Sequence, residues 1–418
     1  MTPTFKALGA LALGVGLAAA ADAGSPDTAR LTVLHTSDLH GSVLPFDDQL
    51  NRASDRGSLA QVATLVAEIR AAADHPVLVL DSGDTIQGTP FEQFVHLRWG
   101  EPSPTIAAMN RIGYQAMAVG NHEFNFGLEV LRRAESQAAF PFLSANTVDE
   151  RSGAPAFPPF RVIEVGPVRV GVLGLTTPSI PGWGSPANYS GLRFEAMDAA
   201  ARRWVAVLRN RERCDVVVVL AHTGFERDPE SGLPDNTEYE NFAWRLTRVP
   251  GIDVLLTGHS HREVMPQIIN GVIVAQPRAR AHLVTRIDLW LEPAGGGFRV
   301  ARWEGANLKV AGAPVDLQLE AQFSPLRRRV AEALDAPVTR AAAPVSVRGC
   351  RLADCAALDL IHAVQLAASG ADLSLASRHG DGEEDALGPA GLGERRPLRF
   401  LAWKLGLASD QVASVARI

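Results

Sequence analysis

The sequence predicts an α/β fold in which strands and helices form a layered sandwich. Short apolar runs of strand length alternate with helical segments, and this alternation implies crossover connections between parallel strands. Polar segments rich in His, Asp and Asn follow several of the apolar runs. Because ligands bind beyond the carboxyl ends of strands in such sheets, we expect a functional site there. At 418 residues, the chain is long enough for one large α/β domain plus a smaller piece.

The first part of the chain predicts four strands and three helices. The first helix has apolar residues three and four positions apart, at Leu59, Val62, Val66 and Ile69, as expected for a helix with one buried face. We expect strands at residues 31–35, 76–80, 115–119 and 140–144, and helices at residues 58–72, 105–111 and 128–137.

The second part continues the alternation. We expect strands at residues 169–175, 215–220, 253–257 and 272–275, and helices at residues 197–209 and 241–247. Residues 314–334 predict a connector with a charged helix. Its basic run, Arg327 to Arg329, is typical of a solvated helix face.

The amino-terminal segment predicts export. Residues 7–20 are apolar and interrupted by Gly, and Ala21-Asp22-Ala23 has the pattern of a cleavage site, so residues 1–23 are interpreted as a signal peptide. The apolar part is too short to span a bilayer comfortably, and we expect no stable membrane span elsewhere. The protein is therefore expected to be exported to the periplasm. The alternative is a retained anchoring helix.

Charge and cysteine content restrict the partners. The chain has 40 basic and 46 acidic residues, for a net charge of −6, and no strong basic patch, which argues against a nucleic-acid polymer as partner. A small anionic molecule would instead be attracted by bound metal ions. Cys350 and Cys355 are close enough in sequence to bridge, with Cys214 alone in a buried strand, or all three are free thiols.

Five histidines in four short segments predict a dinuclear metal site. Each segment follows an apolar run, and a fifth segment adds a carboxylate. The candidate ligands are Asp38, His40, Asp84, Asn121, His222, His259 and His261. This mixture of carboxylate, amide and imidazole groups suits Zn, Mn, Fe or Co, whereas Ca and Mg prefer oxygen ligands alone.

Spacing within the segments gives further expectations. In an extended chain, residues two apart share a face, so Asp38 and His40 would point the same way, as would His259 and His261. Neighbours diverge, so His122 would point away from the side of Asn121, toward whatever the metals hold. Glycines beside the ligands would permit sharp turns; they are Gly41, Gly83, Gly120 and Gly258.

Three other polar residues near the ligands are left out of the predicted site. His35 lies within a strand and is interpreted as structural, as is Glu123 beside His122. Asp81 is either a hydrogen-bond acceptor behind the ligands or a simple strand-end residue.

These segments, in this order, resemble the calcineurin-like metallophosphoesterases. The longer stretches at residues 33–41, 81–88 and 121–124 are similar to the exported 5'-nucleotidase and 2',3'-cyclic-nucleotide phosphodiesterase branch, and the resemblance extends over residues 31–291. It implies an α/β/β/α metallophosphoesterase sandwich with a fragment of the 5'-nucleotidase C-terminal domain.

The resemblance also implies roles for the ligands. Asp84 would bridge two divalent ions. One ion would be held by Asp38, His40, Asp84 and His261, and the other by Asp84, Asn121, His222 and His259.

The family's catalytic histidine, which binds no metal, corresponds to His122. Three residues later this chain has Asn125, where 5'-nucleotidases commonly have an aspartate; asparagine resembles the cyclic-phosphodiesterase members. A neutral amide can orient the imidazole but does not favour imidazolium as a carboxylate does. Both residues are predicted to be catalytic. Substrate-binding residues are not assigned.

The predicted function is metal-dependent hydrolysis of nucleotide phosphate esters, as in a 5'-nucleotidase. The nearest alternative is a 2',3'-cyclic-nucleotide 2'-phosphodiesterase/3'-nucleotidase, and a further one is a non-catalytic binding protein or an inactive truncated chain.

The domain boundaries follow from the resemblance. They place the catalytic domain at residues 30–310, a linker at 311–335 and a partial C-terminal domain at 336–418. In the family, the C-terminal domain stacks the nucleoside base between aromatic side chains. The tail diverges from about residue 378, which predicts either a shortened protein or a changed reading frame.

Overall fold

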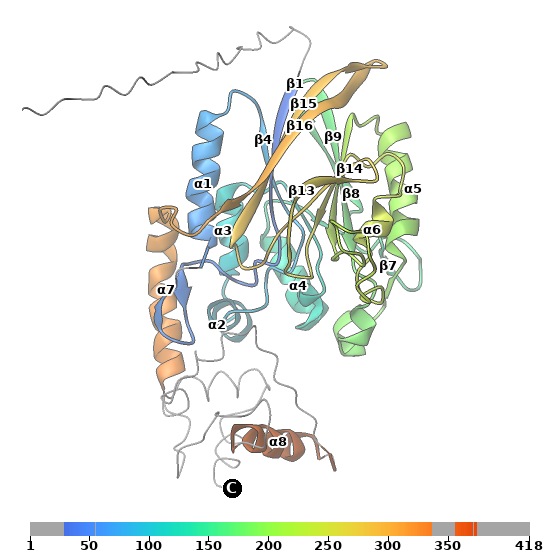
Figure 1. Ribbon diagram of the computed structural model, residues 1–418. Helices are drawn as coiled ribbons and strands as arrows, with labels where there is room; N and C mark the ends of the chain where they lie inside the picture. Colours follow the sequence, from blue (N-terminus) through green and yellow to red (C-terminus); the bar gives the residue numbers. More distant parts are fainter. Residues whose placement is uncertain (1–28, 55, 337–355, 371, 374–418) are drawn as a thin grey trace, which may run out of the picture.

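Two six-stranded sheets lie face to face, with helices on both outer faces (Figure 1). The computed structural model describes residues 29–54, 56–336, 356–370 and 372–373. The predicted α/β/β/α sandwich is therefore confirmed. The predicted signal peptide, Cys350, Cys355 and the tail from about residue 378 lie outside the described residues.

The first sheet combines a parallel half with an antiparallel hairpin. Its order is β16-β15-β1-β4-β5-β6, and β1, β4, β5 and β6 are parallel, so their carboxyl ends meet at one edge. The bounds are β1 (Ala29–Thr36), β4 (Val77–Asp81), β5 (Ala116–Ala118), β6 (Phe142–Leu143), β15 (Leu283–Ala294) and β16 (Gly297–Lys309).

The second sheet has four parallel central strands and antiparallel edges. Its order is β13-β14-β12-β11-β9-β8. The bounds are β8 (Phe160–Val165), β9 (Val168–Thr176), β11 (Val216–His222), β12 (Val254–Thr257), β13 (Glu263–Ile269) and β14 (Val272–Pro277).

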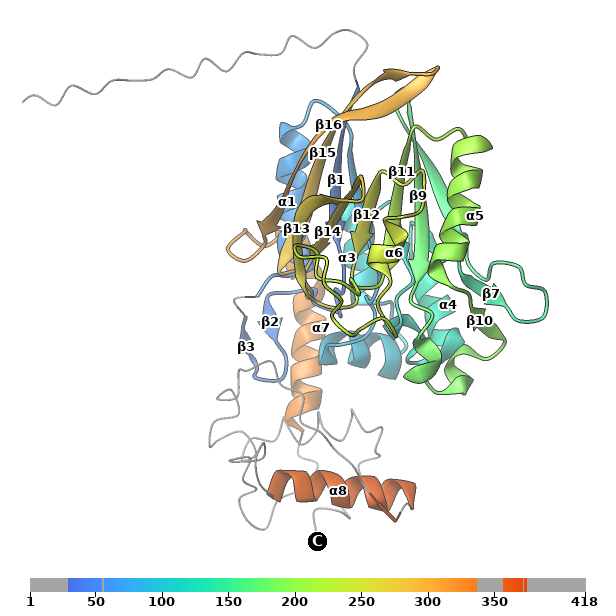
Figure 2. The same cartoon turned by 45° about the vertical axis from the view of Figure 1, so that its right-hand side comes forward.

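Helices cover each sheet separately. Figure 2 shows α1 and α5 on opposite sides of the molecule. The first sheet is covered by α1 (Leu59–Ala72), α3 (Pro104–Ile112), α4 (Gly127–Gln137) and α7 (Leu317–Asp335), and the second by α5 (Met197–Asn210) and α6 (Ala243–Leu246).

Shorter elements form the connections, and one further helix, α8, follows α7. The bounds of these connecting elements and of α8 complete the description. They are β2 (Phe46–Asp47), β3 (Arg52–Ala53), α2 (Pro90–Glu92), η1 (Gln93–Arg98), η2 (His122–Phe124), β7 (Thr147–Asp149), η3 (Ile180–Gly182), η4 (Pro186–Tyr189), β10 (Leu192–Phe194) and α8 (Ala356–Ser369).

Alternation along the strands creates separate apolar layers. In β1, Val33 packs between the two sheets, whereas its neighbour Leu34 packs under the helices. Between the sheets, Val33 lies in one buried cluster with Val218 of β11 and Leu256 of β12. This two-sided burial explains why the strands are continuous apolar runs in the sequence.

The first helix begins and packs as the sequence predicts. Ser58 precedes it and accepts a hydrogen bond from the backbone N–H of Gln61, which satisfies one of the free donors at the helix start. Leu59, Val62 and Val66 are buried on one face. The predicted start at residue 58 is therefore the capping residue.

Helix α7 has a buried apolar face in addition to the basic run, in which Arg328 and Arg329 are exposed, as expected of a solvated face. Phe323 and Val330 are buried in the core beneath the first sheet's helices. The Arg327 guanidinium lies 4.0 Å from the centre of the Phe46 ring, and that of Arg329 lies 3.8 Å from Trp99. Apolar spacing within the helix, rather than its charge, determines its position.

Replacing Phe323 with Ala should destabilise the protein by roughly 3–5 kcal/mol, because it leaves a cavity in the core. The Phe323 side chain is 2% exposed, and its ring contacts that of Phe91 edge-on at 6.0 Å. Leu317→Ala, at a 77% exposed position on the same helix, is the control. Chemical denaturation of both variants measures the difference; equal stability would show that α7 does not pack on the core.

Two further features concern cysteine and the membrane. Cys214 is buried and free, and it lies just before β11 rather than within a strand.

No helix in the described part of the chain combines the length and apolar character needed to cross a bilayer.

Candidate metal centre

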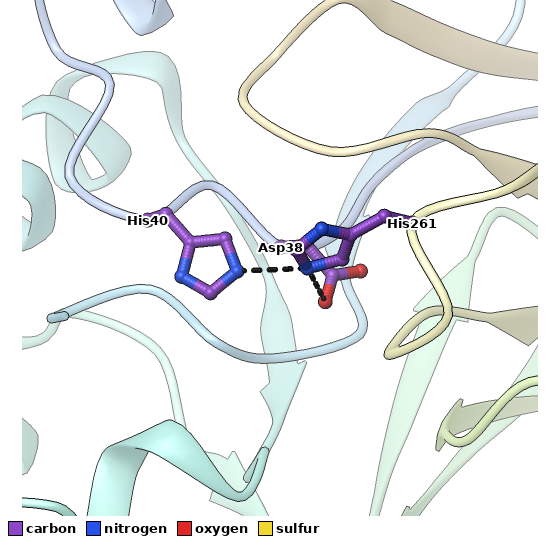
Figure 3. A group of neighbouring side chains, drawn as sticks. All are labelled: Asp38, His40 and His261. Atoms are coloured by element: carbon purple, nitrogen blue, oxygen red, sulfur yellow. Dashed lines mark hydrogen bonds and ion pairs between the residues drawn. The ribbon is translucent and has the colours of Figure 1, made fainter. Parts of the chain in front are cut away.

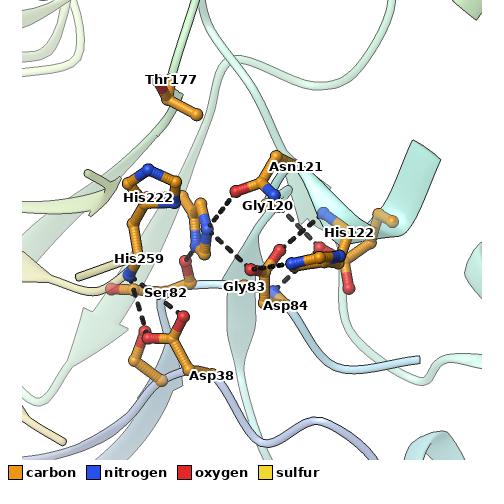
Figure 4. Close-up of polar contacts among 12 residues, drawn as sticks. Asp38, Ser82, Gly83, Asp84, Gly120, Asn121, His122, Thr177, His222 and His259 are labelled. Atoms are coloured by element: carbon orange, nitrogen blue, oxygen red, sulfur yellow. Dashed lines mark hydrogen bonds and ion pairs between the residues drawn. The ribbon is translucent and has the colours of Figure 1, made fainter. Parts of the chain in front are cut away.

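All seven predicted ligands lie where strands of the two sheets end. Asp38, Asp84 and Asn121 follow β1, β4 and β5 of the first sheet. On the second sheet, His222 is the last residue of β11, and His259 follows β12 with His261 two residues later. Segments far apart in the chain therefore converge at one place (Figure 4).

The first group of ligand atoms comes from Asp38, His40 and His261 (Figure 3), and one ligand atom of each lies within 4.8 Å of the others. His40 Nδ1 lies 2.9 Å from the carbonyl oxygen of Gln87, and its Nε2 lies 3.0 Å from Nε2 of His261. His261 Nε2 is in turn 3.5 Å from Asp38 Oδ1. The carbonyl thus orients the His40 ring so that Nε2 faces the other two ligands.

The second group comes from Asp84, His222 and His259, again within 4.8 Å of one another. His222 Nδ1 donates to the carbonyl oxygen of Ser82 at 2.7 Å. Its Nε2 therefore faces two oxygens, Asn121 Oδ1 and Asp84 Oδ2, each 3.0 Å away. Asn121 thus joins this group.

The chemistry of both groups fits a divalent cation. In each group, imidazole nitrogens and carboxylate or amide oxygens point lone pairs at a common centre, and a cation there satisfies them together. Burial lowers the pKa of His40 and of His259 to about 4, which keeps both rings neutral at physiological pH. Neutral imidazole is the form that binds metal.

His222 and Asp84 form a buried pair. Burial disfavours charge on both, but the Asp84 carboxylate raises the pKa of His222 to about 10, and His222 together with His122 holds the pKa of Asp84 well below its usual range. A proton on His222 Nε2 therefore satisfies the facing oxygens in the metal-free protein. A metal ion binding there would displace that proton.

The expected extended backbone at the ligands is wrong. Five ligand residues have positive φ angles: Asp38 (52°), His40 (48°), Asp84 (63°), His259 (68°) and His261 (57°). Side chains two residues apart therefore need not share a face, and His259 and His261 fall in different groups. Left-handed backbone is uncommon for residues with side chains and clusters at functional sites.

Glycines are needed at this edge mainly for close approach. A Cβ atom on Gly120 would lie 2.2 Å from Asp84 Oδ1, and one on Gly258 would lie 1.9 Å from Ser37 Oγ. Neither glycine has a positive φ, unlike Gly41 (73°) and Gly83 (95°). The expected sharp turns therefore apply to the latter pair only.

Glu123 has the structural role expected for it. Its buried carboxylate accepts hydrogen bonds from the backbone N–H groups of Asp84 (2.9 Å), Thr85 (2.6 Å) and Gly120 (2.7 Å). It thereby joins the loop after β4 to the loop after β5, which supply ligands to the second group.

His35 and Asp81 lie behind the ligands. His35 Nε2 lies 2.8 Å from Ser82 Oγ, and burial lowers the pKa of this histidine to about 3. Asp81 accepts hydrogen bonds from Thr36 Oγ1 (2.6 Å) and from the N–H of Gly83 (2.7 Å). Asp81 is thus a hydrogen-bond acceptor that fixes the start of the β4 loop.

His122 stands beside the ligands but belongs to neither group. Its backbone N–H donates to Asp84 Oδ1 at 2.7 Å, and its side-chain Nδ1 lies 2.6 Å from Asn125 Oδ1. Since the amide oxygen can only accept, Nδ1 carries the proton and Nε2 points toward the site, 3.9 Å from Asp84 Oδ2. The side chain is 34% exposed, so a substrate can reach it.

Two hollows adjoin the ligand edge. One, of about 290 Å³, contains Asn121, His122 and His259 in its wall together with Trp183, Tyr189 and Glu240. The other, of about 260 Å³, begins at Gly41 and is lined by charged groups that include Arg56, Arg280 and Arg327. No periodicity or motif in the sequence singles out Trp183, Tyr189 or Glu240, because they lie in loops and short turns.

Fold and site together define an α/β/β/α sandwich with histidine and carboxylate groups assembled at its strand ends. A model of the calcineurin-like phosphoesterase family matches residues 31–263. The chain belongs to the calcineurin-like phosphoesterase family.

Individual proteins extend this comparison. The chain is 33% identical over 267 residues to a 2',3'-cyclic-nucleotide 2'-phosphodiesterase/3'-nucleotidase of Yersinia enterocolitica, covering 60% of this chain and 39% of that protein. It is 30% identical to a 5'-nucleotidase of Vibrio cholerae, covering 62% and 49%. The crystal structure of a putative 5'-nucleotidase from Staphylococcus aureus matches with a TM-score of 0.73 and 26% identity, over 82% of this chain and 67% of that one. The chain thus spans half or less of the length of these two curated relatives.

Proposed function

We propose that this protein hydrolyses phosphate esters of nucleotides, as a 5'-nucleotidase-like phosphomonoesterase with two divalent metal ions. The observation that carries the proposal is the pair of ligand groups that meet beside His122 at one sheet edge. A 5'-nucleotidase among the relatives supports the choice of substrate class.

Each group would hold one ion, of Zn, Mn, Fe or Co. Asp38, His40 and His261 would bind the first, and His222, His259 and Asn121 the second, with Asp84 between them. When bound, two such ions acidify a water molecule for attack on phosphorus and neutralise charge on the phosphoryl oxygens. Ser82 and Gln87 would keep the two histidine rings in position through their carbonyl oxygens.

His122 would act on the substrate directly. Its Nε2 points toward the ligand edge and, when protonated, would donate to a phosphoryl oxygen or to the oxygen of the departing alcohol. Asn125 would hold the ring in this orientation. The backbone of Asn125 is itself held, since its backbone carbonyl oxygen accepts a hydrogen bond from Asn188 Nδ2 at 2.9 Å.

A second candidate is 2',3'-cyclic-nucleotide 2'-phosphodiesterase/3'-nucleotidase activity. The asparagine partner of His122 favours it, since this pairing resembles the cyclic-phosphodiesterase members. The Yersinia relative carries that name.

A comparison of substrates tests both candidates. Purified protein, loaded in turn with each of the four metals, should release phosphate from adenosine 5'-monophosphate faster than it opens adenosine 2',3'-cyclic monophosphate. Faster opening of the cyclic ester would favour the second candidate. If the folded protein hydrolyses neither ester with any of the metals, the result would instead support the alternative of a non-catalytic binding protein.

We also infer export and a modular chain. The pattern at residues 1–23 supports cleavage of a signal peptide and a periplasmic location. A catalytic domain at residues 30–310 is supported by the last sheet strand, which ends at Lys309, and α7 would then be the linker to a partial C-terminal domain. Cell fractionation with mass determination of the purified protein tests the cleavage.

A further inference from the structure

The wall of the hollow beside His122 combines residues of the proposed reaction site with aromatic side chains. The hollow is lined by Asn121, His122 and His259, all from the proposed reaction site. Its wall also includes Trp183 and Tyr189, from the loop after β9. With a volume of about 290 Å³, the hollow is of a size suited to a small organic group.

Trp183 presents its ring to solvent and to the site at once. Its side chain is 46% exposed, although a large indole normally gains free energy by burial. The ring centre lies 5.2 Å from that of His259, with an angle of 35° between the planes. The backbone N–H of Trp183 donates to the carbonyl oxygen of Ile180 at 3.0 Å, which fixes the turn that carries the ring. The indole thus stands as a wall next to a proposed metal ligand.

Packed aromatic rings support this wall from behind. Tyr189 lies 5.7 Å from Phe194, and Phe194 lies 5.4 Å from Phe124, each measured between ring centres. Phe124 is 1% exposed and follows His122 by two residues. The Tyr189 part of the wall and the loop that carries His122 are therefore packed together, which limits the entropy lost when a flat ligand binds.

The charges of the hollow disfavour a second phosphate. None of the described residues that line it is Lys or Arg, and it contains the carboxylate of Glu240, whose Oε2 lies 3.9 Å from His259 Nε2. A carboxylate repels phosphate but accepts hydrogen bonds from hydroxyl groups. The other hollow differs, because three arginines as well as Asp47 and Asp48 line it. The hollow beside His122 therefore suits a neutral, flat group that carries hydroxyls.

We propose that this hollow binds the nucleoside half of the substrate, with the base against Trp183 and sugar hydroxyls directed to Glu240. This inference rests on the proposed function, because the phosphate must lie at the ligand groups. It assigns base recognition to the catalytic sandwich itself, in addition to any contribution from the C-terminal region that the family resemblance implies.

Trp183→Ala tests the inference through a substrate pair. For the nucleotide that the protein hydrolyses fastest, kcat/KM should fall on the order of tenfold, since stacking on an aromatic side chain contributes about 1–3 kcal/mol per base. For ribose 5-phosphate, which has no base, kcat/KM should change less than about twofold on the same reasoning. Trp183→Phe should retain most of the nucleotide activity, because it keeps an aromatic face. Trp290→Ala, at the opposite end of the first sheet, is the matched control.

Adenosine binding gives a readout that does not depend on turnover. Isothermal titration of the protein with adenosine should show binding that Trp183→Ala weakens on the order of tenfold and Trp290→Ala leaves unchanged. If neither ester is hydrolysed but this difference in adenosine binding is found, the proposed function fails and the nucleoside subsite stands. Equal losses on nucleotide and ribose 5-phosphate, or no change in adenosine binding, would overturn the subsite.

Discussion

Asp84→Ala is expected to lower the metal content from about two ions per chain to less than about one, since a bridging carboxylate serves both positions of a two-metal site. Asp84 lies in the second ligand group and is buried, and its charge also interacts with His40 of the first group. Its removal takes away one of the two oxygens that lie 3.0 Å from His222 Nε2 and leaves only that of Asn121. Metal analysis by mass spectrometry after dialysis measures the loss, and hydrolysis should decrease with it.

Asp38→Ala is the matched comparison. Asp38 belongs to the first group only, so its loss should release mainly one ion and leave the other bound. If Asp84→Ala likewise loses only one, Asp84 serves the second group alone, and the bridging role inferred from the family resemblance is wrong. Circular dichroism should show that both variants remain folded, because removing either carboxylate also relieves its desolvation cost.

The sequence placed the candidate ligands at the ends of strands because the cause of that placement is local. Val216 to Leu220 is a continuous apolar run, and such a run is buried on both faces in a parallel sheet. The chain must then turn where the run ends, so His222 at its end could be placed from the run alone. The same argument places Asp38 after β1 and Asp84 after β4.

Long strands at the sheet edge could not be predicted in this way. β16 is mostly exposed or half-buried and carries charged residues such as Arg302 and Glu304, so it lacks a continuous apolar run. β16 is held in the sheet by pairing with β15. β15 in turn pairs along its other edge with β1, whose residues lie 250 or more positions earlier in the chain. Pairing of this kind depends on tertiary context rather than on local propensity.

The backbone at the ligands was also beyond prediction. Positive φ angles at Asp38 and His259 are unfavourable in isolation, and they persist because the surrounding hydrogen bonds require them. One such contact joins the backbone N–H of His259 to Asp38 Oδ2 at 3.0 Å, across 221 residues of sequence. No spacing rule within either segment contains that information.

The wall of the nucleoside hollow shows a third limit. Trp183 and Glu240 are separated in sequence and lie in irregular loops, and neither belongs to a periodic pattern. Only the fold brings both next to His259. The residues proposed to determine substrate specificity are therefore the part of the site that the sequence predicted least.

His122→Ala should leave both ions bound and lower kcat by about 10²–10⁴-fold, the usual contribution of a positioned acid or base. The His122 side chain belongs to neither ligand group. Its loop is held by the hydrogen bond from the His122 backbone N–H to Asp84, and His122→Ala retains this bond because it does not involve the side chain. Steady-state kinetics with metal analysis on the same sample measures both quantities.

Asn125→Ala separates orientation from proton transfer. It removes the acceptor 2.6 Å from His122 Nδ1 but keeps the imidazole, so the loss in kcat should be smaller than for His122→Ala. His75→Ala, which removes a histidine near the opposite end of β1, should leave kcat unchanged and so controls for general effects of losing an imidazole. If His122→Ala instead lost metal in proportion to activity, His122 would be a ligand. Unchanged kcat with full metal content would contradict the catalytic role of His122.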